Sequence, residues 1–362
     1  MATSRSSPPP PGGFEGFFFN DSDVYKVLEG AAYAGLDITA IVEDILAAQQ
    51  PDGYLNTYFI LHPELERWND MGLHEDYCLG HMIEAAIGMA MFNQRMFLMD
   101  GQGAYADLVE LEMYNGILSG ISLEGDRFFY DNPLASPGNI RRKGWFSSSC
   151  CPTSLCRWIP SIAGYIYASG EPNLYINQYI ASRAAFVHCG NEMTVTQETD
   201  YPYDGRVLLR FSRACQAKLR IPGWCGQFTV TANGRREKPE VKDGYIALAL
   251  PDAAQVQLEL SMPVRVVRGN PRSAELRGRV AFARGPVVYC AESCDQPGLY
   301  PDEFFPALLH VHPGAPATLS YCPQELDGII RIHVDGLSLI PYYAWANRTP
   351  CAMTVFLSDA AG

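Results

Sequence analysis

Two adjacent cysteines, Cys150 and Cys151, have the clearest capacity for chemistry in this sequence. Pro152 follows them, and because proline lacks an amide hydrogen and disfavours a helical conformation of the preceding residue, the pair is expected in a loop or a first helical turn. There, unpaired amides and the helix dipole lower the pKa of a thiol. A thiolate is both a nucleophile and a zinc ligand, so the pair could serve one metal site. The alternative is two small buried hydrophobic residues.

The elements that would position this pair are helices. Apolar residues recur at helical spacing after it and predict a helix over residues 153–167, kinked at Pro160. Further helical patterns cover residues 24–32, 38–46, 81–99 and 105–118. The first half of the chain is therefore predicted to be helical, with the cysteine pair at a helix start.

The pattern changes near Tyr175 to short alternating runs separated by Gly, Pro, Asn and Asp, which is typical of a β-sandwich. The predicted strands include residues 193–196, 207–211, 218–222, 228–232 and 256–260. Asn233-Gly234 is the signal of a tight hairpin between two strands. We therefore predict a disordered tail at 1–13, a helical catalytic-type domain at 14–175 and a β-sandwich region at 176–362.

The composition limits the partners. The chain has 362 residues and a formal net charge of -13, with no basic stripe, which argues against nucleic acid or an anionic membrane surface as partner. No window approaches the roughly 18 apolar residues of a membrane span. The N-terminus has no apolar run of the kind found in secretory signals, and the 11 cysteines follow no regular spacing. We expect a cytoplasmic protein with free thiols, and the sequence is compatible with a homodimer.

Several long and unusual phrases carry a resemblance along nearly the whole chain. They include residues 18–26, 74–81, 93–97 and 150–152, together with Gln49-Gln50-Pro51-Asp52-Gly53-Tyr54-Leu55-Asn56-Thr57, Phe128-Phe129-Tyr130-Asp131-Asn132-Pro133-Leu134, Arg220-Ile221-Pro222-Gly223-Trp224 and Ile340-Pro341-Tyr342-Tyr343-Ala344-Trp345-Ala346-Asn347-Arg348. They resemble glycoside hydrolase family 127, the β-L-arabinofuranosidase family with a cysteine and zinc active site. The resemblance implies a helical (α/α)6 barrel, β-sandwich modules after it, and retaining hydrolysis of L-arabinofuranosides. It also implies that Cys150 is the nucleophile and Cys151 a zinc ligand.

The sequence departs from the family pattern in the segment that should complete the zinc site. The family uses a Glu-x-Cys pattern there, with the acid/base glutamate upstream, but here residues 80–86 run straight into residues 87–96, which resemble a later helix. A large internal block is therefore expected to be missing, and the helical barrel to be incomplete. Zn²⁺ would have Cys150, Cys151 and Glu84 as ligands, with Cys78 or His81 as substitutes.

Four further residues are candidates for binding an L-arabinofuranoside-containing oligosaccharide. His74 and His81 are seven residues apart, so both can point to one helix face and bind sugar hydroxyls. Tyr130 lies in a phrase that in the family is near the sugar pocket, and Gln50 lies on a turn from which it could contact sugar hydroxyls. The structural alternatives are helix-end histidines bonded to backbone, a core tyrosine and a plain turn at Gln50.

Two functions follow from these observations. The first is a retaining, zinc-dependent glycoside hydrolase that releases non-reducing-end β-L-arabinofuranosyl or related pentose groups. The second is a catalytically inactive, truncated homologue with a sugar-binding or structural role. The two differ in metal content and in turnover.

Overall fold

The computed structural model describes residues 39–48, 64, 82–144, 154–155, 158–269, 273, 276–296 and 309–360. The chain divides into two units, Met1–His81 and Met82–Gly362. In the first unit the described structure is helix α2 (Thr39–Ala48) and Glu64, so the helix predicted over residues 38–46 is confirmed.

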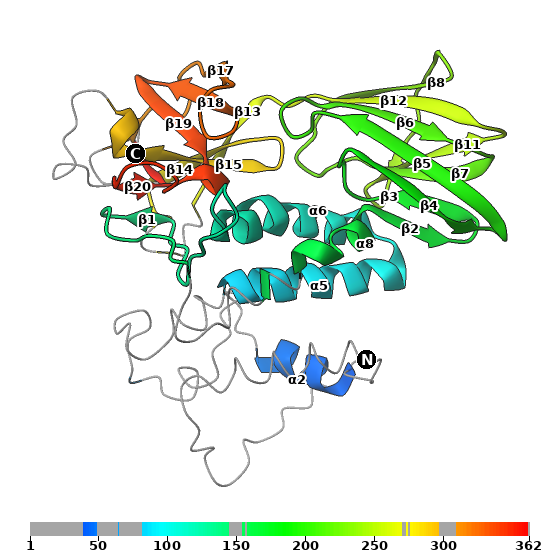
Figure 1. Cartoon of the computed structure of the whole chain (residues 1–362), viewed down its shortest axis with the longest axis horizontal. Coiled ribbons are helices and arrows are strands. Elements are labelled where there is room, and N and C mark those ends of the chain that lie inside the picture. Colours follow the sequence, from blue (N-terminus) through cyan, green and yellow to red (C-terminus); the bar gives the residue numbers. More distant parts are fainter. Residues whose placement is uncertain are drawn as a thin grey trace, which may run out of the picture. The chain divides into compact units, whose positions relative to one another are not determined.

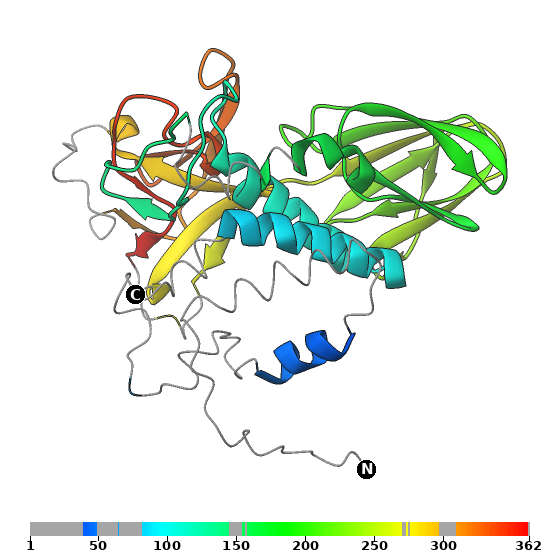
Figure 2. The ribbon, with the colours of Figure 1, turned by 60° about the horizontal axis from the view of Figure 1, so that its bottom comes forward.

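Two helices, α5 (Met82–Asp100) and α6 (Gly103–Leu111), form a hairpin and lie side by side (Figures 1 and 2). The turn between them uses Gly101 at φ +72°, a conformation that glycine adopts without strain. Ile87 and Ala90 of α5 and Val109 of α6 are fully buried. The chain continues from α6 into a π-helix, η2 (Glu112–Ile117), and a 3-10 turn, η3 (Leu118–Gly120), so the predicted helix over residues 105–118 is present with a changed last turn.

The middle part is a β-sandwich of two sheets (Figure 1). One sheet has the order β10 (Val241–Lys242), β11 (Tyr245–Leu250), β7 (Cys215–Arg220), β3 (Asn173–Ile176) and β2 (Tyr167–Gly170). The other has the order β4 (Ser182–His188), β5 (Asn191–Thr199), β6 (Arg206–Phe211), β12 (Ala254–Leu260), β8 (Phe228–Ala232) and β9 (Arg235–Glu237). Alternating buried residues, such as Val256 and Leu258, face the core. The predicted hairpin is confirmed, because Asn233 (φ +48°) and Gly234 (φ +80°) join β8 to β9.

The C-terminal part is a ten-stranded sheet. Its main path is β16 (His310–Val311), β21 (Leu357–Asp359), β14 (Arg279–Arg284), β15 (Val287–Glu292), β19 (Leu337–Pro341), β18 (Ile329–Val334) and β17 (Thr318–Cys322). Beside it, β13 (Val264–Arg268) pairs with β14, and β20 (Met353–Thr354) pairs with β15 and with β1 (Ala135–Ser136). The segment that precedes the cysteine pair thus contributes a strand to this sheet.

A buried ion pair fastens α6 to the middle sandwich. Arg220, at the end of β7, is 0% exposed, and its Nη2 donates to Glu110 Oε1 at 2.6 Å. Glu110 also accepts hydrogen bonds from Tyr201 Oη (2.6 Å) and Trp224 Nε1 (3.1 Å), and Arg220 pairs with Asp107 as well. Burial alone would lower the pKa of Arg220, but the two carboxylates outweigh it and raise that pKa.

The helical barrel is not confirmed. The described helices longer than one turn are α2, α5, α6 and η2, whereas strands dominate the rest. The helix predicted over residues 153–167 is interrupted, with a 3-10 turn η4 (Ile159–Ser161) at Pro160 and a short α8 (Ala163–Ile166) before β2 begins at Tyr167. No helix among the described residues combines the length and apolarity that crossing a membrane requires. The β-rich second half agrees with the sequence, while the predicted domain boundaries stay a prediction.

Candidate functional site

Most of the predicted site residues fall where the structure gives no side-chain description. The following lie outside the described residues: Gln50, His74, His81, Cys150 and Cys151. Glu84 lies in α5, but its side chain is not among those described. Tyr130 is described. The roles of the others stay predictions, and the structure constrains them through the segments on either side.

Both flanks of the cysteine pair are anchored. Before the pair, Phe128 and Lys143 exchange two backbone hydrogen bonds of 2.8 Å, which fixes the chain just before the described residues end at Gly144. After the pair, the side chains of Leu155 and Trp158 are 0% exposed. The described residues on both sides of the pair therefore have fixed positions.

The segment next to Tyr130 is held by aromatic stacking and a buried guanidinium. Phe129 stacks on Trp345 with ring centroids 4.7 Å apart and an interplanar angle of 17°. The guanidinium of Arg142 lies 4.2 Å from the Phe129 ring centroid and donates to the backbone oxygens of Trp345 (2.6 Å) and Ser119 (2.8 Å). Burial lowers the pKa of Arg142 to about 10, so it stays charged at neutral pH.

Asn132 connects this segment to the C-terminal sheet. Its Oδ1 accepts from Tyr342 Oη (3.0 Å) and Trp345 Nε1 (3.1 Å), and its Nδ2 donates to Ser119 Oγ (2.6 Å). Both polar atoms of the Asn132 amide therefore bond to other side chains of the protein. Tyr130 is partly exposed, and its sugar-binding role stays a prediction.

The structure identifies a candidate proton donor, Glu112, that the sequence did not indicate. Glu112 begins the π-helix η2, and a Cβ placed on Gly116 in the same element would lie 2.8 Å from Ala86 Cβ, so η2 packs closely on α5. Burial raises the pKa of Glu112 to about 7. A carboxylic acid that holds its proton near neutral pH can act as a proton donor. No sequence pattern marks a π-helix.

Replacing Glu112 with glutamine should change how stability depends on pH. The folded-state pKa of about 7 exceeds the ordinary value of 4.5, so the folded state holds a proton that the unfolded state has released, and wild-type stability falls as pH rises through this window. At pH 8 we expect Glu112→Gln to be more stable than wild type by about 1–2 kcal/mol, allowing for partial solvent screening, and at pH 4 to be equal.

Urea unfolding at the two pH values measures this difference. The exposed Glu192→Gln is the control and should leave the pH profile unchanged. If Glu112→Gln were no more stable than wild type at pH 8, burial would not be holding the proton on Glu112.

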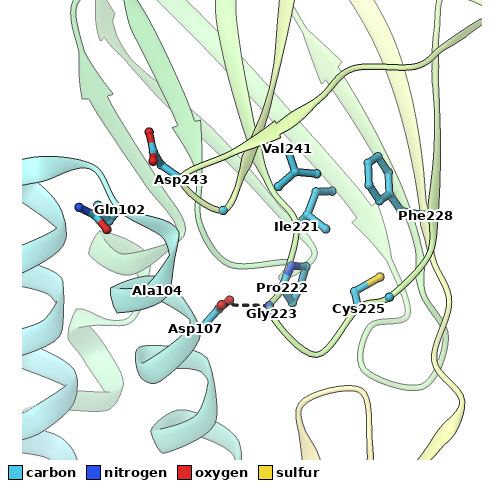
Figure 3. Close-up of a pocket in the computed structure, with 12 residues that line it drawn as sticks. Gln102, Ala104, Asp107, Ile221, Pro222, Gly223, Cys225, Phe228, Val241 and Asp243 are labelled. Atoms are coloured by element: carbon cyan, nitrogen blue, oxygen red, sulfur yellow. Dashed lines mark hydrogen bonds between the residues drawn. The ribbon is translucent and has the colours of Figure 1, made fainter.

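A cavity of about 550 Å³ lies between the start of α6 and loops of the middle sandwich (Figure 3). Asp107 points toward its wall and accepts a 2.9 Å hydrogen bond from the backbone of Gly223. Burial raises the pKa of Asp107, although Arg220 opposes this. Burial also raises the pKa of Cys225, whose thiol donates to Gln227 O at 3.1 Å and is therefore a poor nucleophile. Tyr130, the predicted site residue whose side chain is described, does not line this cavity.

The second unit thus consists of a helical hairpin, a β-sandwich and a ten-stranded sheet. The domain description "Beta-L-arabinofuranosidase, GH127 catalytic domain" matches residues 1–88 and 85–164, the GH127 middle domain matches residues 173–264, and the C-terminal domain of the family matches residues 264–358. The chain therefore belongs to glycoside hydrolase family 127. The two catalytic-domain matches meet inside α5, which confirms the prediction that an internal block is missing there.

Individual relatives agree with this assignment. A "Non-reducing end beta-L-arabinofuranosidase" of Bifidobacterium longum subsp. longum is 34% identical in an alignment 321 positions long, which covers 75% of this chain and 48% of that protein. The solved GH127 β-arabinofuranosidase BT3674 is 34% identical with a TM-score of 0.72, covering 77% of this chain and 49% of the other. A GH127 β-L-arabinofuranosidase of Geobacillus stearothermophilus T6 is 31% identical with a TM-score of 0.69, covering 75% and 49%. The chain thus spans about half the length of these relatives.

Proposed function

We propose that this chain is a retaining glycoside hydrolase that releases non-reducing-end β-L-arabinofuranosyl groups from L-arabinofuranoside-containing oligosaccharides. The observation that carries the proposal is that catalytic, middle and C-terminal parts of family 127 all match the chain. A relative that is 34% identical bears the name of this activity. The described residues on either side of the cysteine pair are anchored by backbone hydrogen bonds and by packing.

The chemistry would centre on Cys150. Its thiolate attacks the anomeric carbon while the glycosidic oxygen takes a proton, and water then releases the sugar from sulfur, so that the configuration is retained. Glu112, whose pKa burial raises to about 7, would serve as the proton donor. Tyr130, with Gln50, His74 and His81, would bind sugar hydroxyls.

Zinc fits the donor set of this chain. Two thiolates and a carboxylate, from Cys150, Cys151 and Glu84, are ligand types that zinc binds, and Glu84 stands on α5 just before the close contact of Ala86 with η2. When bound, zinc would keep the thiols ionised at neutral pH. Three protein ligands leave one position open, as in catalytic zinc sites.

The full-length chain should contain about one zinc per molecule and hydrolyse an aryl β-L-arabinofuranoside. Cys151→Ser should lose most of the metal and the activity, because serine is a poor zinc ligand. Elemental analysis and release of the aryl group measure both properties, and Cys189→Ser, at an exposed cysteine, is the matched control. A wild-type protein without metal and without turnover would instead indicate an inactive family member.

A further inference from the structure

We propose that Cys294 and Cys351 form a reversible disulfide, with a low-molecular-weight disulfide such as oxidised glutathione as the oxidant. Their Sγ atoms lie 3.1 Å apart, in contact although not bonded. Cys294 is in the 3-10 turn η6 (Ser293–Asp295) after β15, and Cys351 precedes β20. This pair lies in the C-terminal sheet and is independent of the proposed hydrolase chemistry.

The backbone places the two cysteines opposite each other. The antiparallel pairing of β15 with β20 ends at Glu292 and Met353. It continues one step further, because Ser293 N donates to Ala352 O at 2.9 Å and Ala352 N donates to Ser293 Oγ at 3.0 Å. The next step brings the cysteines face to face. Cα atoms of directly opposed residues are about 4.5–5.5 Å apart in such pairs, which is within the range of about 4.4–6.8 Å that a disulfide spans.

A metal site is a weaker explanation of the same cluster. The carboxylate of Glu292 and the two thiols lie within 4.8 Å of one another. However, Glu292 Oε2 accepts from Arg348 Nη2 at 2.6 Å, and Oε1 accepts from the backbone nitrogen of Ala346 at 2.7 Å. A cation would have to displace Arg348 from a carboxylate that is 1% exposed. Bond formation between the sulfurs needs no such displacement.

The pair is also arranged for thiol exchange. Cys294 is exposed, so a small disulfide can reach its sulfur, whereas Cys351 is buried. The hydrogen bond between them raises the pKa of Cys294 and lowers the pKa of Cys351, so one proton is shared between two sulfurs. A shared proton leaves the pair with thiolate character, which is what exchange requires.

The exchange balances as two displacements. Cys294 sulfur attacks one sulfur of oxidised glutathione, its proton passes to Cys351, and the glutathione disulfide breaks to release one glutathione thiolate. Cys351 then gives this proton to the released thiolate and attacks Cys294 sulfur in the mixed disulfide, which releases the second glutathione thiolate. One disulfide is made in the protein and one is consumed. In a reducing cytoplasm the pair would remain a dithiol.

The disulfide would close a loop between positions 57 residues apart. This loop contains Trp345, which stacks on Phe129 and so supports the segment before the cysteine pair of the candidate active site. A cross-link lowers the conformational entropy of the unfolded chain. We therefore expect oxidation to raise the temperature midpoint of unfolding by about 5–10 °C.

The test incubates the full chain either with oxidised glutathione or with dithiothreitol. Free thiols are then alkylated, and the peptides are identified by mass spectrometry. We expect a peptide linked through Cys294 and Cys351 in the oxidised sample, its loss in dithiothreitol, and alkylation of the exposed Cys189 in both. Cys294→Ser should remove the linked peptide and the shift in midpoint. Alkylation of both cysteines after oxidation would overturn the proposal. It would also be overturned if zinc ions protected both cysteines of the reduced protein from alkylation, because the pair would then be a metal site.

Discussion

Replacing Cys150 with alanine should lower the hydrolysis of an aryl β-L-arabinofuranoside by more than about 10³-fold, as removal of a catalytic nucleophile does elsewhere. Alanine has no group that can bond to the anomeric carbon, so the two-step route is lost. The flanks of the loop are anchored by the Phe128 and Lys143 pairing and by Trp158, so the variant should fold as the wild type does. Initial rates at saturating substrate measure the effect.

Two controls separate chemistry from structure. Cys189→Ser changes an exposed cysteine in the hairpin between β4 and β5 and should keep wild-type rates. Circular dichroism and the unfolding midpoint of Cys150→Ala should match the wild type. If Cys150→Ala keeps more than a tenth of the activity while folded, another residue is the nucleophile.

Glu110→Ala should reduce the free energy of unfolding by about 3–5 kcal/mol, because it leaves a buried charge without its partner. Arg220 is 0% exposed and Glu110 is 2% exposed in its side chain, and the carboxylate also holds Tyr201 and Trp224. The alanine variant removes four polar contacts, two from Arg220 and one each from these aromatic residues. Chemical unfolding gives the difference.

The matched control is Glu198→Ala. Glu198 pairs with Arg210 on the surface, where both side chains are about half exposed, so its loss should cost less than about 1 kcal/mol. Equal effects of the two substitutions would mean that Arg220 finds other partners, such as Asp107, and that Glu110 is not needed to fasten α6 to β7.

Much of the fold could be predicted because buried apolar residues recur with the period of a helix or a strand. Strand β8 was predicted with its observed ends. The turn was predicted from the Asn233-Gly234 pair, and both residues have the positive φ angles that such a turn requires. The division of the β-rich half into a sandwich and a ten-stranded sheet was not predicted, since alternation marks a strand but not its partner. The π-helix η2 also went unseen, because one extra residue in a turn hardly alters a helical pattern.

Some of the phrases that identified the family have structural roles and do not form the sugar-binding site. Arg220 and Trp224 hold Glu110, and Trp345 with Tyr342 holds Asn132, so two of the quoted phrases maintain contacts between elements rather than bind sugar. The contact between Cys294 and Cys351 could not be predicted from the sequence, because the two are 57 residues apart and only strand register brings them together.

The most direct test of the proposed function is the anomer first released by the wild-type chain. Proton NMR of an aryl β-L-arabinofuranoside during hydrolysis distinguishes the two anomers of L-arabinofuranose before they equilibrate. A double displacement on Cys150 predicts that the β anomer appears first. Initial release of the α anomer, or no arabinose at all from a folded and zinc-supplied protein, would contradict the account.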